Sequence, residues 1–369
     1  MNHNHVLLVS IALGFGTMQL FAADEPTKEV NRTGEQSKSP LDTQPQPWQR
    51  RAQPIISALT TKQSWCKVVV YSPRVALVGG VYRMWYCGTS TGSRAGDCSL
   101  GYAESADGID WKESPDNPIV RADKIGWGSG FWNPCVRFDE EEKVYKMWFS
   151  SNRFRELNAE GRLVKIDMAL GYATSPDGRH WKIHPEPIHE TGFGPCVIKT
   201  GPDHYRMWMN SPGDNRNDPA AMYQNIHSFN SRDGIHWKRD NVPAIQPTGE
   251  LSSSVYPWVI RDGGRYVLWH AGHVPGGRFE IFAATSPDGL QWTPKHEQAA
   301  FPATGGRNDF DGRYTSTPCV LALKDRYLLY YSSRDWQTTY RDGQGRIRKD
   351  GGGVYSHVGV AVIPRASKE

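Results

Sequence analysis

Acidic side chains at repeated positions are the first residues whose types and spacing suggest chemistry. Glu250 and Asp311 each lie seven residues before a Pro-x-Val segment, while Asp97 and Asp167 each lie three residues before a leucine. Two carboxylates held close together can divide the work of a general acid and a general base. Acids that share a register equally well cap turns or hold loops, and this alternative stays open for each of them.

Aromatic and polar side chains in the connecting loops suggest a site for a sugar. A sugar ring stacks on flat aromatic faces while its hydroxyls hydrogen-bond to fixed polar groups. Trp132 and Trp258 are not shared between repeats, so each can line such a site or fill a core. The candidate substrate-binding residues are Arg74, Trp132, Asn133, Arg153, Trp258, His270 and His273.

The histidines do not have the spacing of a metal site. His270 and His273 either bind sugar hydroxyls, hold a central ion or are buried structural residues. We therefore predict no metal ligand set and no cofactor, although the pattern leaves room for a central structural ion.

A repeat of about sixty residues organises the chain. Each copy opens with Pro-x-Val, continues into an aromatic-rich strand and, in four copies, ends in Ser-x-Asp-Gly followed by Trp. The spacing between successive Pro-x-Val segments is 61, 61, 62 and 61 residues. These segments are residues 73–75, 134–136, 195–197, 257–259 and 318–320. A fixed period of this length indicates a repeat architecture.

The repeat predicts an all-β, five-bladed β-propeller with four antiparallel strands, A to D, in each blade. Alternating aromatics mark strand B, and Asp-Gly marks a tight turn between strands C and D. The fifth repeat lacks its last strand, while residues 64–68 precede the first repeat. We expect this N-terminal segment to complete the last blade and so remove an exposed sheet edge. The B–C loops and D–A links then share one face, where the long polar connections surround a mouth.

The N-terminal region has a different composition. Residues 1–23 contain an apolar run followed by Ala22 and Ala23, which predicts a signal peptide and a periplasmic or secreted protein. Residues 24–53 are polar and predict a disordered linker, which leaves 54–365 for the propeller. A net charge of +4 gives no reason to expect nucleic acid as a partner, and no second apolar run is long enough to span a membrane.

The cysteines argue mostly for packing. Cys135, Cys196 and Cys319 occupy the middle of three Pro-x-Val segments, where a small buried residue is expected. Cys87 and Cys98 flank one loop, and a local disulfide between them is an open alternative.

Residues 60–364 resemble the five-bladed propeller glycosidases, the group that holds families 43, 32, 68 and 130. The resemblance rests on the blade signature, as in residues 145–149 and 170–178. It implies glycosyl transfer by two acidic side chains. In these families the base or nucleophile is typically an Asp directly before a strand A proline, as in Asp-Pro-Arg-Val. Here the five positions hold Ser72, Asn133, Gly194, Tyr256 and Thr317.

Two functions follow from this departure. Either the catalytic acids have moved, or the protein binds glycans without cleaving them. For the first we predict Glu250 as proton donor and Asp311 as base, with Asp167, Asp97 and Glu280 as further candidates. The resulting hypothesis is a secreted glycoside hydrolase, expected to be a monomer, that acts on a plant or algal oligosaccharide or polysaccharide.

Overall fold

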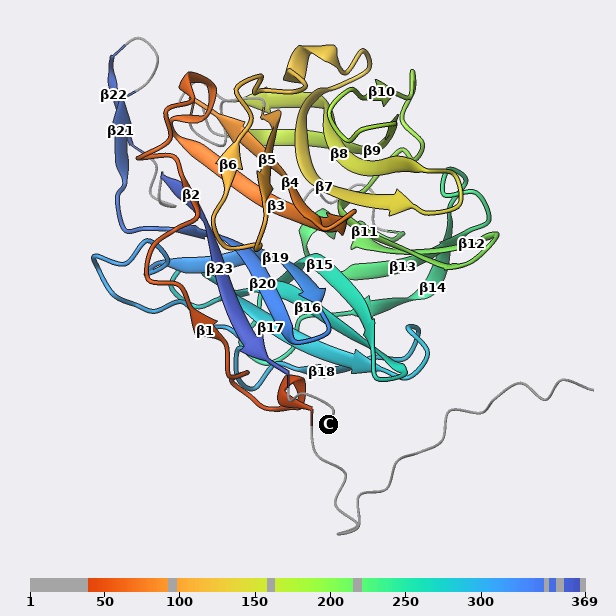
Figure 1. Cartoon of the computed structure of the whole chain (residues 1–369). Coiled ribbons are helices and arrows are strands. Elements are labelled where there is room, and N and C mark those ends of the chain that lie inside the picture. The colour runs from red at the N-terminus through yellow and green to blue at the C-terminus, as the bar shows by residue number, and fades with distance from the viewer. Residues whose placement is uncertain are drawn as a thin grey trace, which may run out of the picture. The chain divides into compact units, whose positions relative to one another are not determined.

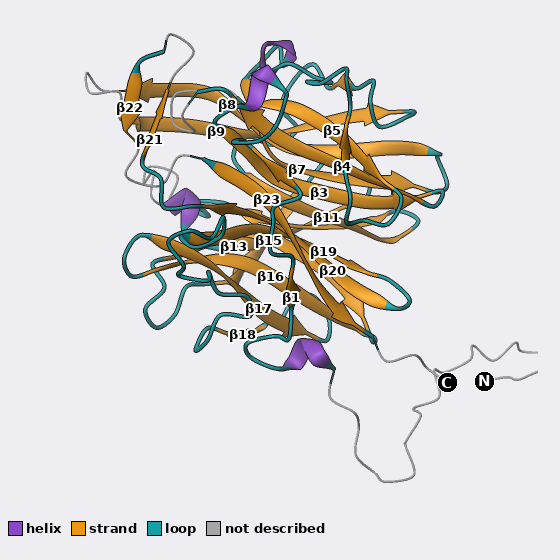
Figure 2. Cartoon of the chain, turned by 60° about the vertical axis from the view of Figure 1, so that its left-hand side comes forward, coloured by secondary structure: helices purple, strands orange, loops and turns teal. Residues whose placement is uncertain are grey.

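The sequence repeats fold into antiparallel sheets that form the blades of a propeller (Figure 1). The computed structural model describes residues 39–91, 98–157, 163–214, 221–341, 345–349 and 355–365, and strands dominate them (Figure 2). Blades 1 to 4 are continuous in sequence and hold four strands each. Blade 1 contains β3 (Val69–Val78), β4 (Val81–Thr89), β5 (Ser99–Ser105) and β6 (Lys112–Glu113), and blade 2 contains β7 (Ser129–Asp139), β8 (Val144–Leu157), β9 (Leu163–Ser175) and β10 (Lys182–Ile183). Blade 3 contains β11 (Phe193–Gly201), β12 (His204–Asn210), β13 (Ile226–Ser231) and β14 (Lys238–Ile245). Blade 4 contains β15 (Ser253–Asp262), β16 (Arg265–Val274), β17 (Arg278–Ser286) and β18 (Thr293–Lys295).

Blade 5 combines the two ends of the chain. It contains β19 (Tyr314–Ala322), β20 (Arg326–Arg334) and β23 (Ser356–Pro364), and β1 (Gln49–Arg50) and β2 (Ile56–Ser57) both pair with β23. Closure by an N-terminal strand is therefore confirmed. The first strands β3, β7, β11, β15 and β19 contact one another in sequence, and β19 contacts β3, which closes the ring.

The closing segment is not the one expected from the sequence. Residues Ser64–Cys66 form the short 3-10 helix η2 instead of a strand. Trp65 stacks on Tyr86 of blade 1 at 5.7 Å between ring centroids. Gly88 and Gly101 make room for its indole, because a Cβ at either position would lie within 3 Å of Trp65. An aromatic that packs sideways on a blade is hard to distinguish by sequence from a strand residue.

Residues 40–53, which the sequence assigned to a disordered linker, pack on the propeller instead. They include the 3-10 helix η1 (Pro40–Asp42) and β1, and Leu41 and Trp48 are buried. The buried Gln46 accepts hydrogen bonds from the indoles of Trp48 and Trp269, each at 2.9 Å. The hydrogen bonds from these two tryptophans fix the polar segment 40–53 against the propeller.

Four C–D turns share one hydrogen-bonding scheme, which confirms the Asp-Gly prediction. In the first, the hydroxyl of Ser105 accepts from the N–H of Gly108, while Asp107 accepts from two following N–H groups. The turn glycines are Gly108, Gly178, Gly234 and Gly289, with φ between 75° and 79°. The carbonyls of Gly178 and Gly234 accept the indole N–H of Trp85 and Trp148 from the preceding blades, each at 2.7 Å. The repeated motif therefore joins neighbouring blades as well as turning the chain.

The B–C connections and D–A links lie at one end of the blades, opposite the A–B and C–D turns. Strands continue into several of the connections. In blade 2, β8 and β9 run on as a long hairpin, and in blade 4 only residues 275–277 separate β16 from β17. In blade 5, β21 (Thr339–Arg341) and β22 (Ile347–Lys349) form a separate hairpin. The remaining 3-10 helices are η3 (Ala122–Lys124) and η4 (Ala221–Tyr223), and no described helix is long and apolar enough to cross a bilayer.

Candidate functional site

A strained backbone position recurs at the inner end of every blade. Ser72, Asn133, Gly194, Tyr256 and Thr317, the residues before the strand A prolines, all have φ between 45° and 65°. The pairing of strands A and B shifts register at each of these places. A positive φ is costly for residues other than glycine and persists only where the surrounding structure enforces it.

Strand B of the preceding blade forms a side-chain hydrogen bond to three of these bulges. The N–H of Ser72 donates to the hydroxyl of Ser332 at 2.7 Å, and the N–H of Gly194 donates to the hydroxyl of Ser150 at 3.0 Å. The N–H of Tyr256 donates in the same way to the side-chain oxygen of Asn210 at 3.1 Å. The bulges therefore bring the first residues of the inner strands close to one another at the same end of the blades.

Aromatic side chains from all five blades form one connected set of ring contacts beside these bulges. Tyr256 lies 6.1 Å from Tyr71, 5.4 Å from Phe193 and 6.4 Å from Phe279 between ring centroids. Tyr71 also contacts Trp132, and Phe279 contacts Tyr314. We call this group the aromatic mouth; its members are Tyr71, Trp132, Phe193, Tyr256, Phe279 and Tyr314.

Sequence reasoning found only Trp132 among these residues. A signal for more was present, because the residue two positions before the proline is aromatic in three repeats, as Tyr71, Trp132 and Phe193. Tyr256 occupies the bulge position itself. Sequence reasoning considered Tyr256 only as a residue before a strand A proline and did not single out the others, because a strand pattern does not mark the residue that a bulge turns inward.

Buried polar groups without partners accompany the aromatic mouth. Asn152 is 2% exposed, and neither its amide nitrogen nor its amide oxygen has a hydrogen-bond partner among the residues that the structure describes. The indole nitrogen of Trp132 is also buried and has no partner in that part of the chain. Asn152 is the strand partner of Met168, which packs with Trp132 and Phe193 in one cluster. Native proteins seldom leave such groups unsatisfied, so a bound polar molecule is a natural partner for them.

Asn133 and Arg153 have different surroundings. Asn133 is buried at its bulge, and its side-chain oxygen accepts the hydroxyl of Ser72 at 2.9 Å. Arg153 forms an ion pair with Asp167 at 2.9 Å and donates to the carbonyl of Glu190 at 3.1 Å. Asp167 is thus engaged in a surface ion pair, and Asp97 lies outside the described residues.

Arg74 and Trp258, which the sequence suggested as substrate-binding residues, lie in the packed centre of the propeller. Both are fully buried at the propeller axis. The Arg74 guanidinium donates to backbone carbonyls, including that of Pro134 at 2.8 Å, and the Trp258 indole donates to the carbonyl of Val320 at 2.9 Å. The middle position of Pro-x-Val faces the axis, which the sequence spacing alone did not reveal.

Asp311, the predicted catalytic base, lies in buried surroundings that do not favour this role. It is 2% exposed, forms an ion pair with Arg50 at 2.6 Å and accepts the hydroxyl of Tyr331 at 2.9 Å. Arg50 lies on β1, so this carboxylate anchors the strand that closes the ring. Both contacts are made to one carboxylate oxygen, Oδ2, and they hold the buried side chain in place.

The two histidines have unlike environments. His270 is fully buried and its ring nitrogen lies 3.1 Å from that of His296; burial lowers the pKa of His270 to about 3. It stays neutral and structural at ordinary pH. His273 is half-buried, bonds the hydroxyl of Ser252 at 2.8 Å and packs on Phe279 of the aromatic mouth, with centroids 4.9 Å apart. Only His273 therefore contacts the predicted binding region.

A second hollow on the same face contains the predicted proton donor. This pocket of about 560 Å³ is lined by Glu250, Arg278, Glu280, His296, Glu297 and apolar residues of blade 4. We call it the acidic pocket. Burial raises the pKa of Glu280 above its usual range, opposed by the Arg278 charge and by the N–H of Ala303. Glu250 and Glu297 are exposed, so the three carboxylates of this pocket differ in solvation.

The predicted acids are therefore not gathered in one mouth. Glu250 and Glu280 share the acidic pocket, while Asp311 is an anchor and Asp167 an ion-pair partner. Strand alternation places Phe279 and Glu280 on opposite faces of β17, so the aromatic mouth and the acidic pocket are separate features. Within the described residues no group of three or more His, Cys, Asp or Glu side chains could hold a metal ion. All six cysteines are buried free thiols, so Cys87 and Cys98 are not bridged.

Solved structures of similar fold come from carbohydrate-active proteins. A glycosyl hydrolase of Bacteroides ovatus matches with a TM-score of 0.62 and 16% identity over 87% of this chain and 96% of its own. The chain has the fold of the five-bladed glycosidase propellers. A structure from the GH130 family of mannoside phosphorylases, which contains hydrolases that target β-1,2 mannosidic linkages in Candida mannan, matches with a TM-score of 0.61 and 17% identity over 87% and 96% of the two chains.

Not all such structures are glycosidases. An N-acetylgalactosamine deacetylase of F. plautii, solved with blood group B trisaccharide, matches with a TM-score of 0.62 and 15% identity over 86% and 95% of the chains. In sequence, protein Rv1502 of Mycobacterium tuberculosis is 29% identical over 153 residues, which is 41% of this chain and 47% of that protein. The match thus spans about half of the relative's length. No family model matches the chain.

The Arg50–Asp311 pair gives a direct test of its anchoring role. Arg50→Ala leaves Asp311 buried without its cation and should lower the free energy of unfolding by about 3–5 kcal/mol. Urea denaturation measures this loss. The double variant Arg50→Ala/Asp311→Asn removes the uncompensated charge and should recover part of it. An Arg50→Ala protein as stable as wild type would show that Asp311 does not depend on this partner.

Proposed function

We propose that the protein is a secreted glycoside hydrolase whose acidic pocket cleaves a plant or algal oligosaccharide. The observation that carries the proposal is the half-buried Glu280 carboxyl, whose raised pKa favours a protonated side chain, beside the exposed Glu250. Carboxyl groups whose surroundings move their pKa values apart are suited to separate acid and base roles. The glycosidase folds of the structural neighbours support this choice of chemistry.

The assignment of roles changes in one respect. Glu280 is the better candidate for the proton donor, because desolvation favours its protonated form. Glu250, which the sequence suggested as donor, takes the role of base. Glu280 gives its proton to the leaving glycosidic oxygen as the bond to the anomeric carbon breaks. Glu250 removes a proton from water, whose oxygen forms the new bond to that carbon.

Other lining groups of the acidic pocket support binding. Arg278, on the same strand and the same face as Glu280, is positioned to bond sugar hydroxyls and to stabilise the carboxylate that remains after proton transfer. Phe282 and Leu251 provide apolar surface in the same pocket. Leu251 packs with the buried Phe282, so the apolar side of the pocket is part of the packed core.

A second candidate function is glycan binding without cleavage, at the aromatic mouth. The specific observation in its favour is the combination of rings from every blade with the unpartnered amide of Asn152 and indole nitrogen of Trp132. A sugar supplies C–H faces for the rings and hydroxyls for these polar groups. The six residues of the aromatic mouth are aromatic and Asn152 carries an amide, so these groups are suited to binding a sugar and supply no catalytic acid.

The hydrolase proposal is tested by sugar release from a panel of plant and algal oligosaccharides. Glu280→Gln removes the proton donor and should lower kcat/KM about 10²- to 10⁴-fold, with a comparable loss for Glu250→Gln. Glu140→Gln, an exposed change in an A–B turn at the opposite face, serves as control and should keep full activity. If wild type cleaves a substrate and Glu280→Gln cleaves it equally well, Glu280 is not the acid. If no substrate is cleaved but binding occurs and is lost in Trp132→Ala, the second candidate function is correct.

The raised pKa of Glu280 also predicts how stability depends on pH. A carboxyl whose pKa is higher in the folded state stabilises the fold at low pH, and this contribution is lost as pH rises through the folded-state pKa. Wild type and Glu280→Gln should therefore have equal melting temperatures below about pH 4, with the variant more stable near neutral pH. Thermal unfolding of both proteins across this range is the measurement. Parallel curves at every pH would contradict the desolvation of Glu280.

A further inference from the structure

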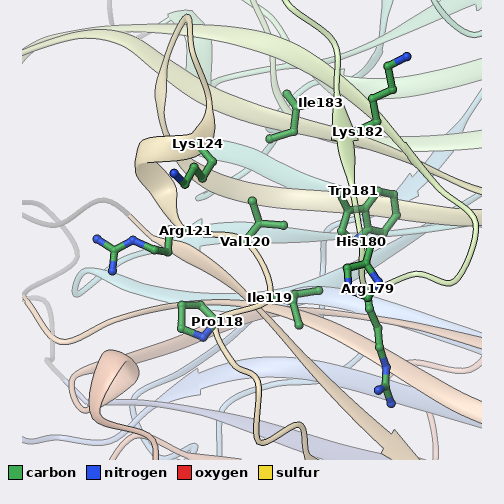
Figure 3. A pocket seen from close by; sticks show the side chains of 10 residues that line it. All are labelled: Pro118, Ile119, Val120, Arg121, Lys124, Arg179, His180, Trp181, Lys182 and Ile183. Atoms are coloured by element: carbon green, nitrogen blue, oxygen red, sulfur yellow. The ribbon is translucent and has the colours of Figure 1, made fainter.

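A groove of about 790 Å³ lies between the outer edges of blades 1 and 2. Figure 3 shows its two sides: residues 118–121 and Lys124 from the link that leaves blade 1, and residues 179–183 from the last turn and strand β10 of blade 2. The groove is distinct from the aromatic mouth and from the acidic pocket, which involve none of its lining residues.

The charges along this groove have one sign. Its lining includes Arg121, Lys124, Arg179, His180 and Lys182, and none of the ten lining residues is acidic. Arg179 forms an ion pair with Glu104 at 3.2 Å, and Arg121 forms one with Asp123 at 3.3 Å. Lys124 and Lys182 are exposed, and within the described residues their ammonium groups form no ion pair or hydrogen bond. Their charges are available to a ligand.

The floor of the groove is apolar. In Figure 3 the side chains of Ile119, Val120 and Ile183 lie between the two sides, with the ring of Trp181 beside them, while the charged ends spread outward. Trp181 is half-buried, since its indole donates to the carbonyl of Gly178 and its edge packs on Trp85. An apolar floor with a cationic rim fits a ligand that has both C–H faces and negative charges.

The arrangement of the cations indicates a polymer and not a small anion. A single phosphate or carboxylate is bound where several donors converge on one point. Here the cationic ends lie at different places around the rim (Figure 3). Charges repeated along an extended chain can meet several of them at once, with gains that add through multivalency.

We propose that this groove binds a segment of an acidic polysaccharide, with sugar rings on the apolar floor and carboxylate or sulfate groups at Lys124 and Lys182. The inference rests on the proposed function only in taking the ligand to be a carbohydrate. It adds a substrate class, anionic glycans, and a site that would hold the polymer outside the place of cleavage. Tethering of this kind raises the local concentration of chain ends at the acidic pocket.

The test measures binding of the full chain to polymers of different charge, using the Glu280→Gln protein so that no substrate is consumed. Polygalacturonate tests carboxylate groups, dextran sulfate tests sulfate groups, and neutral dextran tests the sugar backbone alone. We expect binding to at least one acidic polymer, weakened as salt rises from about 0.05 to about 0.5 M. Lys124→Glu and Lys182→Glu should each weaken it roughly five- to tenfold.

A matched control comes from the repeat. Lys238 follows Trp237 in blade 3 as Lys182 follows Trp181 in blade 2, is equally exposed and does not line the groove. Lys238→Glu should leave binding unchanged. Equal loss in Lys238→Glu, or no loss in the two groove variants, would overturn the site. Equal or tighter binding of polyglutamate or single-stranded DNA would overturn the choice of a glycan. Loss of hydrolysis in Glu280→Gln bears on the proposed function alone, because the binding readout does not depend on cleavage.

Discussion

A closed ring of contacts at the propeller axis is the constraint on which the other features depend. The middle residue of each Pro-x-Val segment reaches the first strand of the next blade. Arg74 donates to the carbonyl of Pro134 and Trp258 to that of Val320, while Cys135, Cys196 and Cys319 accept the N–H groups of Val197, Val259 and Val75 at 3.2–3.3 Å. Arg74 also donates to carbonyls of Thr317 and Pro318, so one buried cation joins blade 1 to blade 5 as well as to blade 2. Three different side-chain chemistries thus perform one task at one repeat position.

This ring of contacts also positions the bulges and the aromatic residues at the B–C end of the blades. Because the inner strands are fixed at the axis, the chain must bulge just before each proline, and strand B of the neighbouring blade holds several of these bulges by a side-chain hydrogen bond. The bulges turn Tyr256 toward Tyr71 and Phe193, and an aromatic mouth results. The acidic pocket depends on the scaffold less directly. It forms where β17 meets the links before and after blade 4, and burial there raises the pKa of Glu280.

The sequence predicted the architecture well because each blade repeats its local rules. The period of Pro-x-Val, the alternation in strand B and the Ser-x-Asp-Gly turn all indicate the same fold. The turn glycines lie where the motif predicts them, and one of them, Gly178, also contacts Trp85 of the preceding blade. The site was harder. Arg74 and Trp258 face the axis through contacts between residues about sixty positions apart, and Asp311 is paired with Arg50 from the opposite end of the chain. No local pattern encodes such partners. Glu280 is half-buried and Glu250 is exposed. This difference in solvation comes from the packing of the fold, and the spacing of residues in the sequence does not predict it.

The most direct test of the axial ring is the stability of Arg74→Met, which keeps the length of the side chain and removes its donors. The account predicts that urea unfolding shows a loss of about 3–5 kcal/mol, because several buried carbonyls from three blades lose their partner at once. Arg74→Met with a free energy of unfolding within about 1 kcal/mol of wild type would contradict it. In that case the blades would be held by strand packing alone, and the bulges that form the mouth would need another cause.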